Sequence, residues 1–382
     1  MARNAVKKAS LVGEMGFIKG GGKVNWFPGH MASATRAIRD RLKLSDFVIE
    51  VRDARIPLSS KNDELQPLLA GKKRVVALNK KDLANPNIMH KWTRYFDSIK
   101  QDCLTINAHS RSSVQKLLDL VEYKMKEAIY KEPTLLVLVV GVPNVGKSAL
   151  INSIHQIASS RFPASNDGRS SIIVQEKRKR ATVGPLPGVT QDIAGFKIAH
   201  QPSIYVLDTP GVLIPSIPDI ETGLKLAAAG SVKDSVVGEE RIAQYLLAVL
   251  NSRGTPLHWR RFMDAGSDRR LESVDDKPDY SLENLLPKRK RPPIIKSDVV
   301  YIEDVVTRVQ GALCRTLMEF NGSLEDEGEF GDLIDQQFEA LQKALKIPHK
   351  TSEARTMASK KFLTLFRMGK LGPFILDDVP DQ

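Results

Sequence analysis

The stretch LLVLVVGVPNVGKSALINSI, Leu135–Ile154, decides the fold of this chain. Six apolar residues predict a buried strand, and the apolar ALINSI predicts a helix after the loop. Between them, Gly141–Ser148 matches the phosphate-loop pattern GxxxxGK[ST], in which backbone N–H groups at a helix N-terminus hold phosphate oxygens. In such a loop Lys147 reaches the β- and γ-phosphates and Ser148 is a ligand of Mg²⁺. The sequence therefore predicts a nucleotide site, whose loop residues are Asn144, Val145, Gly146, Lys147, Ser148 and Ala149.

Four further short apolar runs predict strands and alternate with helical patterns. A helix is expected at 114–130, where apolar residues recur at helical spacing. Strands that are buried on both faces and joined by helices form mostly parallel sheets. We expect an α/β domain with such a sheet, built from strands at 46–51, 75–79, 103–107, 135–140 and 204–208.

The tetrad NKKD, Asn79–Asp82, follows the strand at 75–79 and resembles a guanine reader. A carboxylate at Asp82 would accept from both N–H donors of the guanine edge, which rejects adenine because the edges do not match. Asn79 would tie this loop to the phosphate loop, and the stem of Lys80 would lie on the base. Taken alone, a lysine-rich tetrad is more often a solvated turn. The other motifs of the chain therefore decide whether NKKD is a guanine-binding motif.

Two more segments complete a GTPase set. DTPG, Asp208–Gly211, ends the strand at 204–208, where Asp208 can hold Mg²⁺ through water and the Gly211 N–H can sense the γ-phosphate. LPGVT, Leu186–Thr190, offers the Thr190 hydroxyl to the metal and to catalysis. Each segment alone is commonly an ordinary loop. Together, however, the segments occur where a single nucleotide-binding fold has its ligand-binding loops, which strengthens the assignment.

The order of these segments is unusual because NKKD precedes the phosphate loop. An ordinary GTPase that is cut after DxxG and rejoined at its old ends has this order, and termini that lie close together permit it. We therefore predict a circularly permuted P-loop GTPase domain, with the order base loop, second base loop, phosphate loop, first switch, second switch. The second base loop is INAHS, Ile106–Ser110, in which Asn107 and Ala108 would back the base, with the Ala108 amide near the guanine oxygen.

The charge, the cysteine count and the apolar runs of the sequence limit the kinds of partner that are expected. The 382 residues carry a net charge of +12, with basic runs at 176–180 and 287–293, which favours a polyanion but also fits a basic soluble surface. Two cysteines far apart exclude a disulfide framework. No apolar run approaches the roughly 20 residues that cross a bilayer, so no membrane insertion is expected.

Three parts are expected along the chain. Residues 1–24 form a basic leader or an arm that touches RNA, residues 25–214 the GTPase domain, and residues 215–382 a helical, RNA-binding domain. Helical patterns at 303–319 and 352–366 belong to the last part, and an irregular insertion interrupts it at about 254–297. The leader suggests a mitochondrial address, with chloroplast, nucleolus or cytoplasm as alternatives.

With these motifs together, the chain resembles the circularly permuted ribosome-assembly GTPases, in particular the DAR GTPases and mitochondrial ribosome-associated GTPases. Besides the four motifs above, the resemblance rests on WFPGHM, Trp26–Met31, on VRDARIP, Val51–Pro57, and on the expected helices at GLKLAAAG and IAQYLL. The resemblance implies a monomeric GTP- and GDP-binding factor that contacts rRNA and matures the large ribosomal subunit.

The hydrolysis chemistry is incomplete in the sequence. Val212 stands where many GTPases have a glutamine that orients water, so slow intrinsic hydrolysis is expected, with stimulation by ribosomal particles. The resemblance implies a K⁺ ion held in part by Asn144, although a loop-bracing role fits that residue as well. A nucleotide-gated RNA-binding scaffold with incidental hydrolysis is the alternative function, and an adenine-nucleotide enzyme is opposed by Asp82.

Overall fold

The structure is a computed structural model, and it describes residues 15–16, 29–161, 194–200, 203–213, 217, 219–252, 296–348 and 353–380. Both basic runs, nearly all of the expected leader and the insertion up to residue 295 lie outside these ranges. The chain divides into two compact units, one of Gly22–Val237 with Pro373–Gln382 and one that includes Gly238–Gly372. Each unit is described below by itself.

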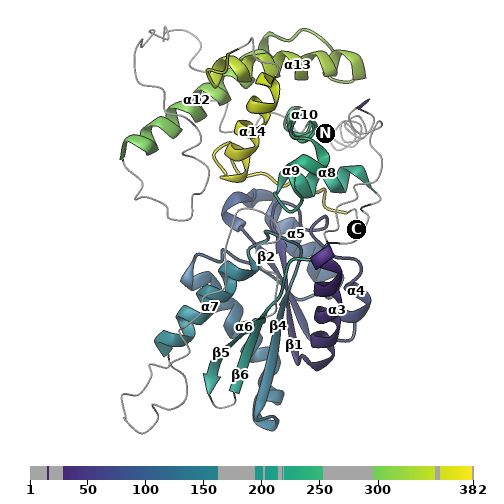
Figure 1. The fold of residues 1–382 in the computed structure, drawn as a ribbon, viewed down its shortest axis with the longest axis vertical. Helices are drawn as coiled ribbons and strands as arrows, with labels where there is room; N and C mark the ends of the chain where they lie inside the picture. Colours follow the sequence, from purple (N-terminus) through teal and green to yellow (C-terminus); the bar gives the residue numbers. More distant parts are fainter. Residues whose placement is uncertain are drawn as a thin grey trace. The chain divides into compact units, whose positions relative to one another are not determined.

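The first unit is built on a six-stranded sheet with the order β3-β2-β1-β4-β6-β5 (Figure 1). Five of these strands run parallel, which confirms the predicted α/β fold with a mostly parallel sheet. The strands are β1 (Phe47–Asp53), β2 (Arg74–Asn79), β3 (Cys103–Thr105), β4 (Thr134–Val140), β5 (Ala194–His200) and β6 (Ser203–Asp208).

One strand of the sheet was not predicted from the sequence. β5 pairs antiparallel with β6 at the edge of the sheet, with an irregularity between Lys197 and Ala199. Its sequence AGFKIAH alternates only partly, and it contains a glycine, so the pattern does not separate it from a loop. The pairing with β6 is a tertiary contact that a propensity scan does not register.

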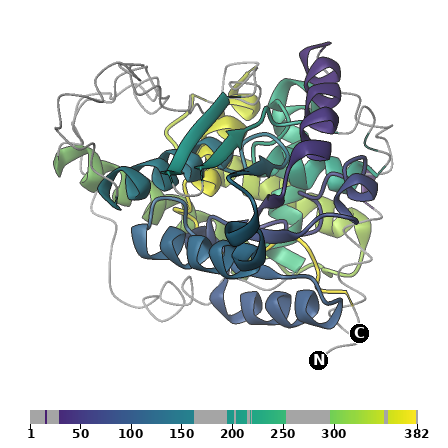
Figure 2. The same cartoon turned by 90° about the horizontal axis from the view of Figure 1, so that it is seen from below.

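Helices lie on both sides of this sheet (Figures 1 and 2). All seven residues of β1 are buried, as expected for a central strand that is covered on both faces. The α-helices of the unit are α3 (Gly29–Leu44), α4 (Gln66–Leu69), α5 (Pro86–Ser98), α6 (Arg111–Lys131), α7 (Lys147–Arg161), α8 (Ile220–Ala228) and α9 (Asp234–Val237), and a short 3-10 helix spans Lys81–Leu83.

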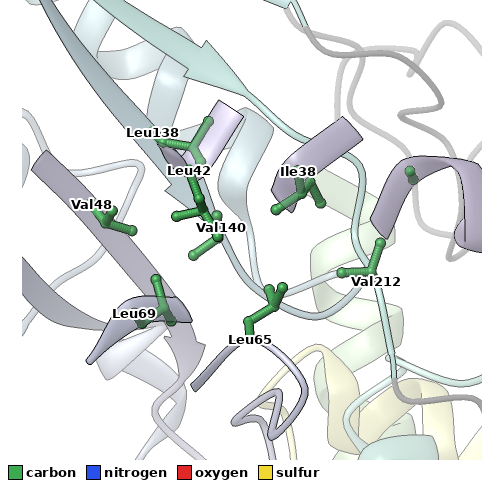
Figure 3. Close-up of a cluster of buried hydrophobic side chains, with 9 residues drawn as sticks. Ile38, Leu42, Val48, Leu65, Leu69, Leu138, Val140 and Val212 are labelled. Atoms are coloured by element: carbon green, nitrogen blue, oxygen red, sulfur yellow. The ribbon is translucent and has the colours of Figure 1, made fainter. Parts of the chain in front are cut away.

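A cluster of buried apolar side chains joins α3 to the sheet (Figure 3). Ile38 and Leu42 of α3 are spaced four residues apart, so they share one face of the helix. They pack with Val48 of β1, Val140 of β4 and Val212, a residue of the second switch segment. The core therefore reaches the edge of the sheet at which the motif segments lie.

The second unit is helical, as predicted. It contains α10 (Glu239–Ser252), α12 (Lys296–Glu319), α13 (Glu327–Ala344) and α14 (Ala354–Arg367). α13 was not predicted, and α12 begins seven residues before the expected 303. Asp326 caps α13 by accepting a hydrogen bond of 2.9 Å from the Glu329 N–H.

A buried amide pair specifies the packing of the second unit. Asn251 of α10 and Gln337 of α13 exchange two hydrogen bonds, of 2.8 and 3.0 Å, and both side chains are buried. A pair of this kind satisfies its polar groups only in one register of the two helices. Among the described residues, no helix is long and apolar enough to cross a membrane.

The division between the units falls at Val237 and Gly238, whereas the sequence placed a boundary after residue 214. α8 and α9 thus belong to the unit with the sheet. The segment from Pro373 onward also returns to that unit after the last helix. A contiguous boundary read from the sequence misses such a return because it assumes that a domain is one stretch of chain.

Candidate nucleotide site

Four predicted motif segments meet at one edge of the sheet, and the fifth, Leu186–Thr190, lies outside the described residues. β1, β2, β3, β4 and β6 are parallel, so their carboxyl ends lie on the same edge. The base loop follows β2, the second base loop follows β3, the phosphate loop follows β4, and the second switch segment follows β6. In open α/β sheets this edge is where ligands bind.

The phosphate loop leads from β4 into the first turn of α7. The Lys147 ammonium donates to the Val142 carbonyl at 2.9 Å, which folds the side chain back over the loop. Gly146 has a φ of 96° and lies so close to Asn79 that a Cβ there would collide with the amide of Asn79. Glycine is required at this position both for its backbone conformation and for the approach of the base loop.

Asn79 joins three of the loops. Its Nδ2 donates to the Val145 carbonyl at 2.8 Å, and its Oδ1 accepts from the Ala108 N–H at 2.9 Å. The side chain is 2% exposed. One buried amide at the end of β2 therefore holds the phosphate loop and the second base loop together.

The second base loop is braced by local hydrogen bonds. Asn107 Oδ1 accepts from the His109 N–H at 2.8 Å, and the Asn107 N–H donates to Ser113 Oγ at 2.9 Å. The Ala108 carbonyl accepts from Ser153 Oγ of α7 at 2.5 Å. The Ala108 amide, which the sequence placed near the guanine oxygen, donates to Asn79 here, so a guanine oxygen would share this donor or replace Asn79 as its acceptor.

Lys80 has a left-handed backbone, with φ 63°, and its side chain lies between two loops. Its ammonium donates to the Asn144 carbonyl at 2.6 Å and to Asp53 Oδ2 at 2.8 Å. These two contacts direct the stem of Lys80 across the space between the base loop and the phosphate loop. Asp82, two residues later, is exposed.

Asp53 is the first residue of the DAR segment, Asp53–Arg55, at the end of β1. Its two carboxylate oxygens accept from the Arg55 guanidinium at 3.0 and 2.8 Å, in a bidentate pair. Asp53 and Arg55 are 1% and 2% exposed. Burial acts to raise the pKa of Asp53, but Arg55 and Lys80 outweigh it and hold the pKa well below its ordinary value.

Asn144 also has a left-handed backbone, with φ 58°. Its Nδ2 donates to the Gly230 carbonyl at 2.8 Å, in the turn after α8. Ser231 Oγ in the same turn donates to the Pro143 carbonyl at 2.8 Å. The turn after α8 therefore supports the phosphate loop from the side of the second switch segment.

Two of the three oxygen ligands expected for Mg²⁺ lie together. Ser148 Oγ donates to Asp208 Oδ2 at 3.0 Å, and Asp208 is 1% exposed. Among the described residues, Asp208 Oδ1 is buried without a hydrogen-bond partner. A hydroxyl beside an incompletely paired carboxylate fits a hard cation. Thr190, the third predicted ligand, lies outside the described residues.

The second switch segment approaches the phosphate loop through Gly211, where a Cβ would collide with the backbone of Pro143. Val212 then turns into the apolar cluster under α3, where it is fully buried (Figure 3). Its carbonyl accepts from Asn62 Nδ2 at 2.9 Å. A side chain in this position faces the core, which gives a physical reason for valine in place of a polar residue.

Burial also affects the lysine of the phosphate loop. It lowers the pKa of Lys147 to about 8, although Asp208 acts in the opposite direction. Lys147 is 5% exposed. A lysine with such a pKa is still charged at neutral pH and loses its charge above about pH 8, and nucleotide phosphates beside it would favour the charged form.

Relatives of the chain decide its family. The protein named Short integuments 2, mitochondrial, from Arabidopsis thaliana is 68% identical over 100% of this chain and 96% of its own length. DAR GTPase 2, mitochondrial, from the same plant is 38% identical over 93% of this chain and 90% of its own length. The chain belongs to the mitochondrial DAR GTPase family.

Two further similarities agree with this assignment. Mitochondrial ribosome-associated GTPase 1 of Mus musculus is 34% identical to this DAR GTPase over 73% of the chain and 80% of the mouse protein. A family model described as 50S ribosome-binding GTPase matches residues 164–295. The chain is thus also similar to GTPases that are named for association with ribosomes.

Two parts of the site were missed from the sequence. The DAR segment was noted only as a family signature, yet Asp53 pairs with both Lys80 and Arg55. The segment Pro373–Asp378, which contacts the DAR segment and the base loop, carried no motif. Its only sequence signal is the apolar Phe374–Leu376 before two acids, which is too common a pattern to assign.

Proposed function

We propose that this DAR GTPase binds guanine nucleotide at the carboxyl edge of its sheet and acts as a GTP-hydrolysing assembly factor for the large ribosomal subunit of mitochondria. The observation that carries the proposal is Asn79, which bonds to the phosphate loop and the second base loop at once. Such a contact supports an arrangement in which Asp82, Lys80 and the phosphate-binding residues surround one nucleotide. A solvated turn at NKKD would give no reason for the Asn79 side chain to be buried against a phosphate loop.

The same contacts support a circularly permuted order of the motifs. β2 and β4 both neighbour β1 in the sheet, so the base loop and the phosphate loop lie close although the base loop comes first in the sequence. Ligand binding depends on where the loops meet in space, and the order of their connections is free as long as the sheet is preserved.

We propose slow intrinsic hydrolysis, because the residue after DTPG is the buried Val212 and cannot orient water. Charge compensation would come from Lys147, from Mg²⁺ held by Ser148, Asp208 and Thr190, and from K⁺. The Nδ2 bond from Asn144 to Gly230 orients that amide, so its oxygen faces away from Gly230. This orientation supports Asn144 as part of a K⁺ site that ribosomal particles would complete.

The partner and the compartment are proposed from charge and from the relatives. A net charge of +12 favours rRNA, and the names of the two plant relatives and the mouse relative place those proteins in mitochondria or with mitochondrial ribosomes. We propose a monomer that binds the large subunit through its helical unit when GTP is bound. Imaging of the tagged chain with and without residues 1–24 tests the address.

Co-sedimentation with mitochondrial large subunits tests the function. We expect tighter binding with a non-hydrolysable GTP analogue than with GDP, since only differential affinity lets GTP drive binding and release. Affinity should fall on the order of a hundredfold between roughly 50 and 200 mM salt if several phosphates are contacted. Lys147→Ala serves as the control, because a chain that cannot hold the phosphates should bind the large subunit equally with either nucleotide. Equal binding with both nucleotides would contradict the switch.

The rate of GTP hydrolysis distinguishes an assembly factor from an RNA-binding scaffold. An assembly factor requires strong stimulation of GTP hydrolysis by large subunits, whereas an RNA-binding scaffold requires nucleotide-dependent binding only. Multiple-turnover rates should therefore be measured with and without particles, at saturating GTP and in potassium buffer. Unchanged rates together with nucleotide-dependent binding would favour the scaffold.

A further inference from the structure

The segment Pro373–Asp378 lies between the base loop and the DAR segment. The Phe374 N–H donates to the Leu83 carbonyl at 3.1 Å, and the Leu376 N–H donates to the Arg55 carbonyl at 2.7 Å. Leu83 directly follows Asp82, the proposed guanine reader. The backbone of this segment therefore bridges two loops that leave neighbouring strands, at one residue from Asp82 and within the DAR segment itself.

Apolar packing holds the segment in this position. Ile375 is 3% exposed and lies in a buried cluster with Ala54 of the DAR segment, Ala84 after the base loop and Trp92 of α5. Burial of an isoleucine side chain contributes free energy that is independent of any ligand. The segment is therefore part of the folded unit before nucleotide binds.

Asp377 fixes the register of the segment. Its Oδ2 accepts from the Leu58 N–H at 2.8 Å and the Ser59 N–H at 2.9 Å, and its Oδ1 accepts from Ser59 Oγ at 2.6 Å. Lys225 of α8 forms an ion pair with it at 3.5 Å. The residue is 4% exposed. A buried carboxylate with three donors and one cation specifies a single arrangement of the loop after the DAR segment and of the segment around itself.

We propose that Asp377 is a positioning residue for guanine recognition. It fixes the segment Pro373–Asp378, which in turn holds the backbone after Asp82 through Leu83 and the DAR segment through Arg55. Arg55 orients Asp53, and Asp53 pairs with Lys80. The inference rests on the proposed guanine site, because Asp377 acts only through Asp82 and Lys80 and touches no nucleotide itself.

A structural role alone would have a different signature. A variant that merely loosens the fold weakens all nucleotides by the same factor, since only the folded fraction binds. A displaced base loop instead weakens the nucleotides that use the base loop most. Inosine diphosphate lacks the exocyclic amine that Asp82 is expected to bind, so comparison of GDP with inosine diphosphate isolates that contact.

The test measures the affinities of the full chain for GDP and inosine diphosphate by calorimetry, together with thermal unfolding. For Asp377→Asn we expect GDP affinity to fall about tenfold, with a smaller fall for inosine diphosphate, so that the ratio of the two affinities shrinks. Asp97→Asn makes the same change at an exposed residue of α5, outside this segment, and should keep both affinities and their ratio. Unchanged GDP affinity in folded Asp377→Asn, or an equal loss for both nucleotides, would overturn the inference.

A milder variant covers the case in which Asp377→Asn does not fold. Ser59→Ala removes one donor to Asp377 and leaves the carboxylate, its two backbone donors and Lys225 in place. We expect about a threefold loss of GDP affinity and a smaller ratio of GDP affinity to inosine diphosphate affinity. If the affinity and the ratio both equal those of the parent chain, the inference is overturned. If the parent chain binds no guanine nucleotide, or binds ADP as tightly as GDP, the proposed function fails and the inference fails with it. If the parent chain prefers GDP and the variants keep the parental affinities, the inference alone fails.

Discussion

The Lys80 ammonium lies 2.8 Å from Oδ2 of Asp53, so the base loop is held by the DAR segment. The same carboxylate binds Arg55, so one buried anion at the end of β1 contacts two cations. The base loop is thus attached to the neighbouring strand by a buried charge. This relationship gives the DAR segment a physical role that its sequence does not reveal.

Replacement of this anion should be costly. Asp53→Asn leaves the buried Arg55 guanidinium and the Lys80 ammonium without their counter-charge, and breaking a buried pair in this way typically costs about 3 kcal/mol or more. We expect a lower free energy of unfolding and weaker GDP binding. Asp40→Asn, which breaks the exposed pair with Lys43 at 3.3 Å, should change neither. Denaturant unfolding and calorimetry check both variants, and equal effects would contradict the role of Asp53.

Asp82→Asn should exchange guanine for xanthine. An amide donor suits the xanthine carbonyl that replaces the guanine amine, whereas in guanine it faces the amine, a second donor, and leaves it unpaired. We expect GDP affinity to fall at least about a hundredfold, with a gain for xanthosine diphosphate. Asp97→Asn, at an exposed position on α5, serves as the control. Retained GDP affinity in the Asp82 variant would rule out the assignment of the base reader.

The pH dependence of nucleotide binding should report on Lys147. Its pKa in the free protein is about 8, and bound phosphate favours the protonated form. The folded free protein therefore loses this proton as pH rises through about 8, so affinity is full below that value and falls above it. Binding should take up a proton near pH 8, which calorimetry in buffers of different ionisation enthalpy detects. Lys147→Ala should bind weakly without this dependence, and proton release by the parent would contradict the prediction.

Potassium should stimulate hydrolysis more than sodium. The reason is the buried Val212 together with an amide oxygen of Asn144 that the Gly230 bond orients. Asn144→Ala should erase the difference between the two salts while much of the GDP affinity remains. Asn87→Ala, at an exposed position, should keep the difference. GTP turnover in matched KCl and NaCl buffers provides the measurement, and identical parental rates would exclude the ion from the mechanism.

The apolar cluster under α3 should control stability. Ile38 is fully buried beside Val212, and replacing such a side chain with alanine costs about 3 kcal/mol through lost burial and the cavity left behind. Leu44→Ala, on the same helix at 62% exposure, should cost little. Chemical denaturation compares the two. A similar loss in both variants would contradict the role of this cluster.

The sequence by itself determined the parts of the site that are local. A phosphate loop is a contiguous backbone path between a strand and a helix, so GVPNVGKS predicts its own geometry, and NKKD and DTPG follow strands whose apolar runs are plain. The mostly parallel sheet followed from these runs for the same reason. Even the meeting of the loops was predictable, because parallel strands bring their carboxyl ends to one edge.

Only the tertiary structure decided which distant residues support these loops. Asp53 and Lys80 stand 27 positions apart, and Asp377 and Ser59 stand 318 positions apart, so no spacing in the sequence announces either contact. β5 likewise exists through its pairing with β6, and Val212 is buried because α3 covers it. Local motifs are selected by backbone conformation, which neighbouring residues determine. Buried charges and edge strands are satisfied by partners that the folded chain brings close, and those partners can come from anywhere along it.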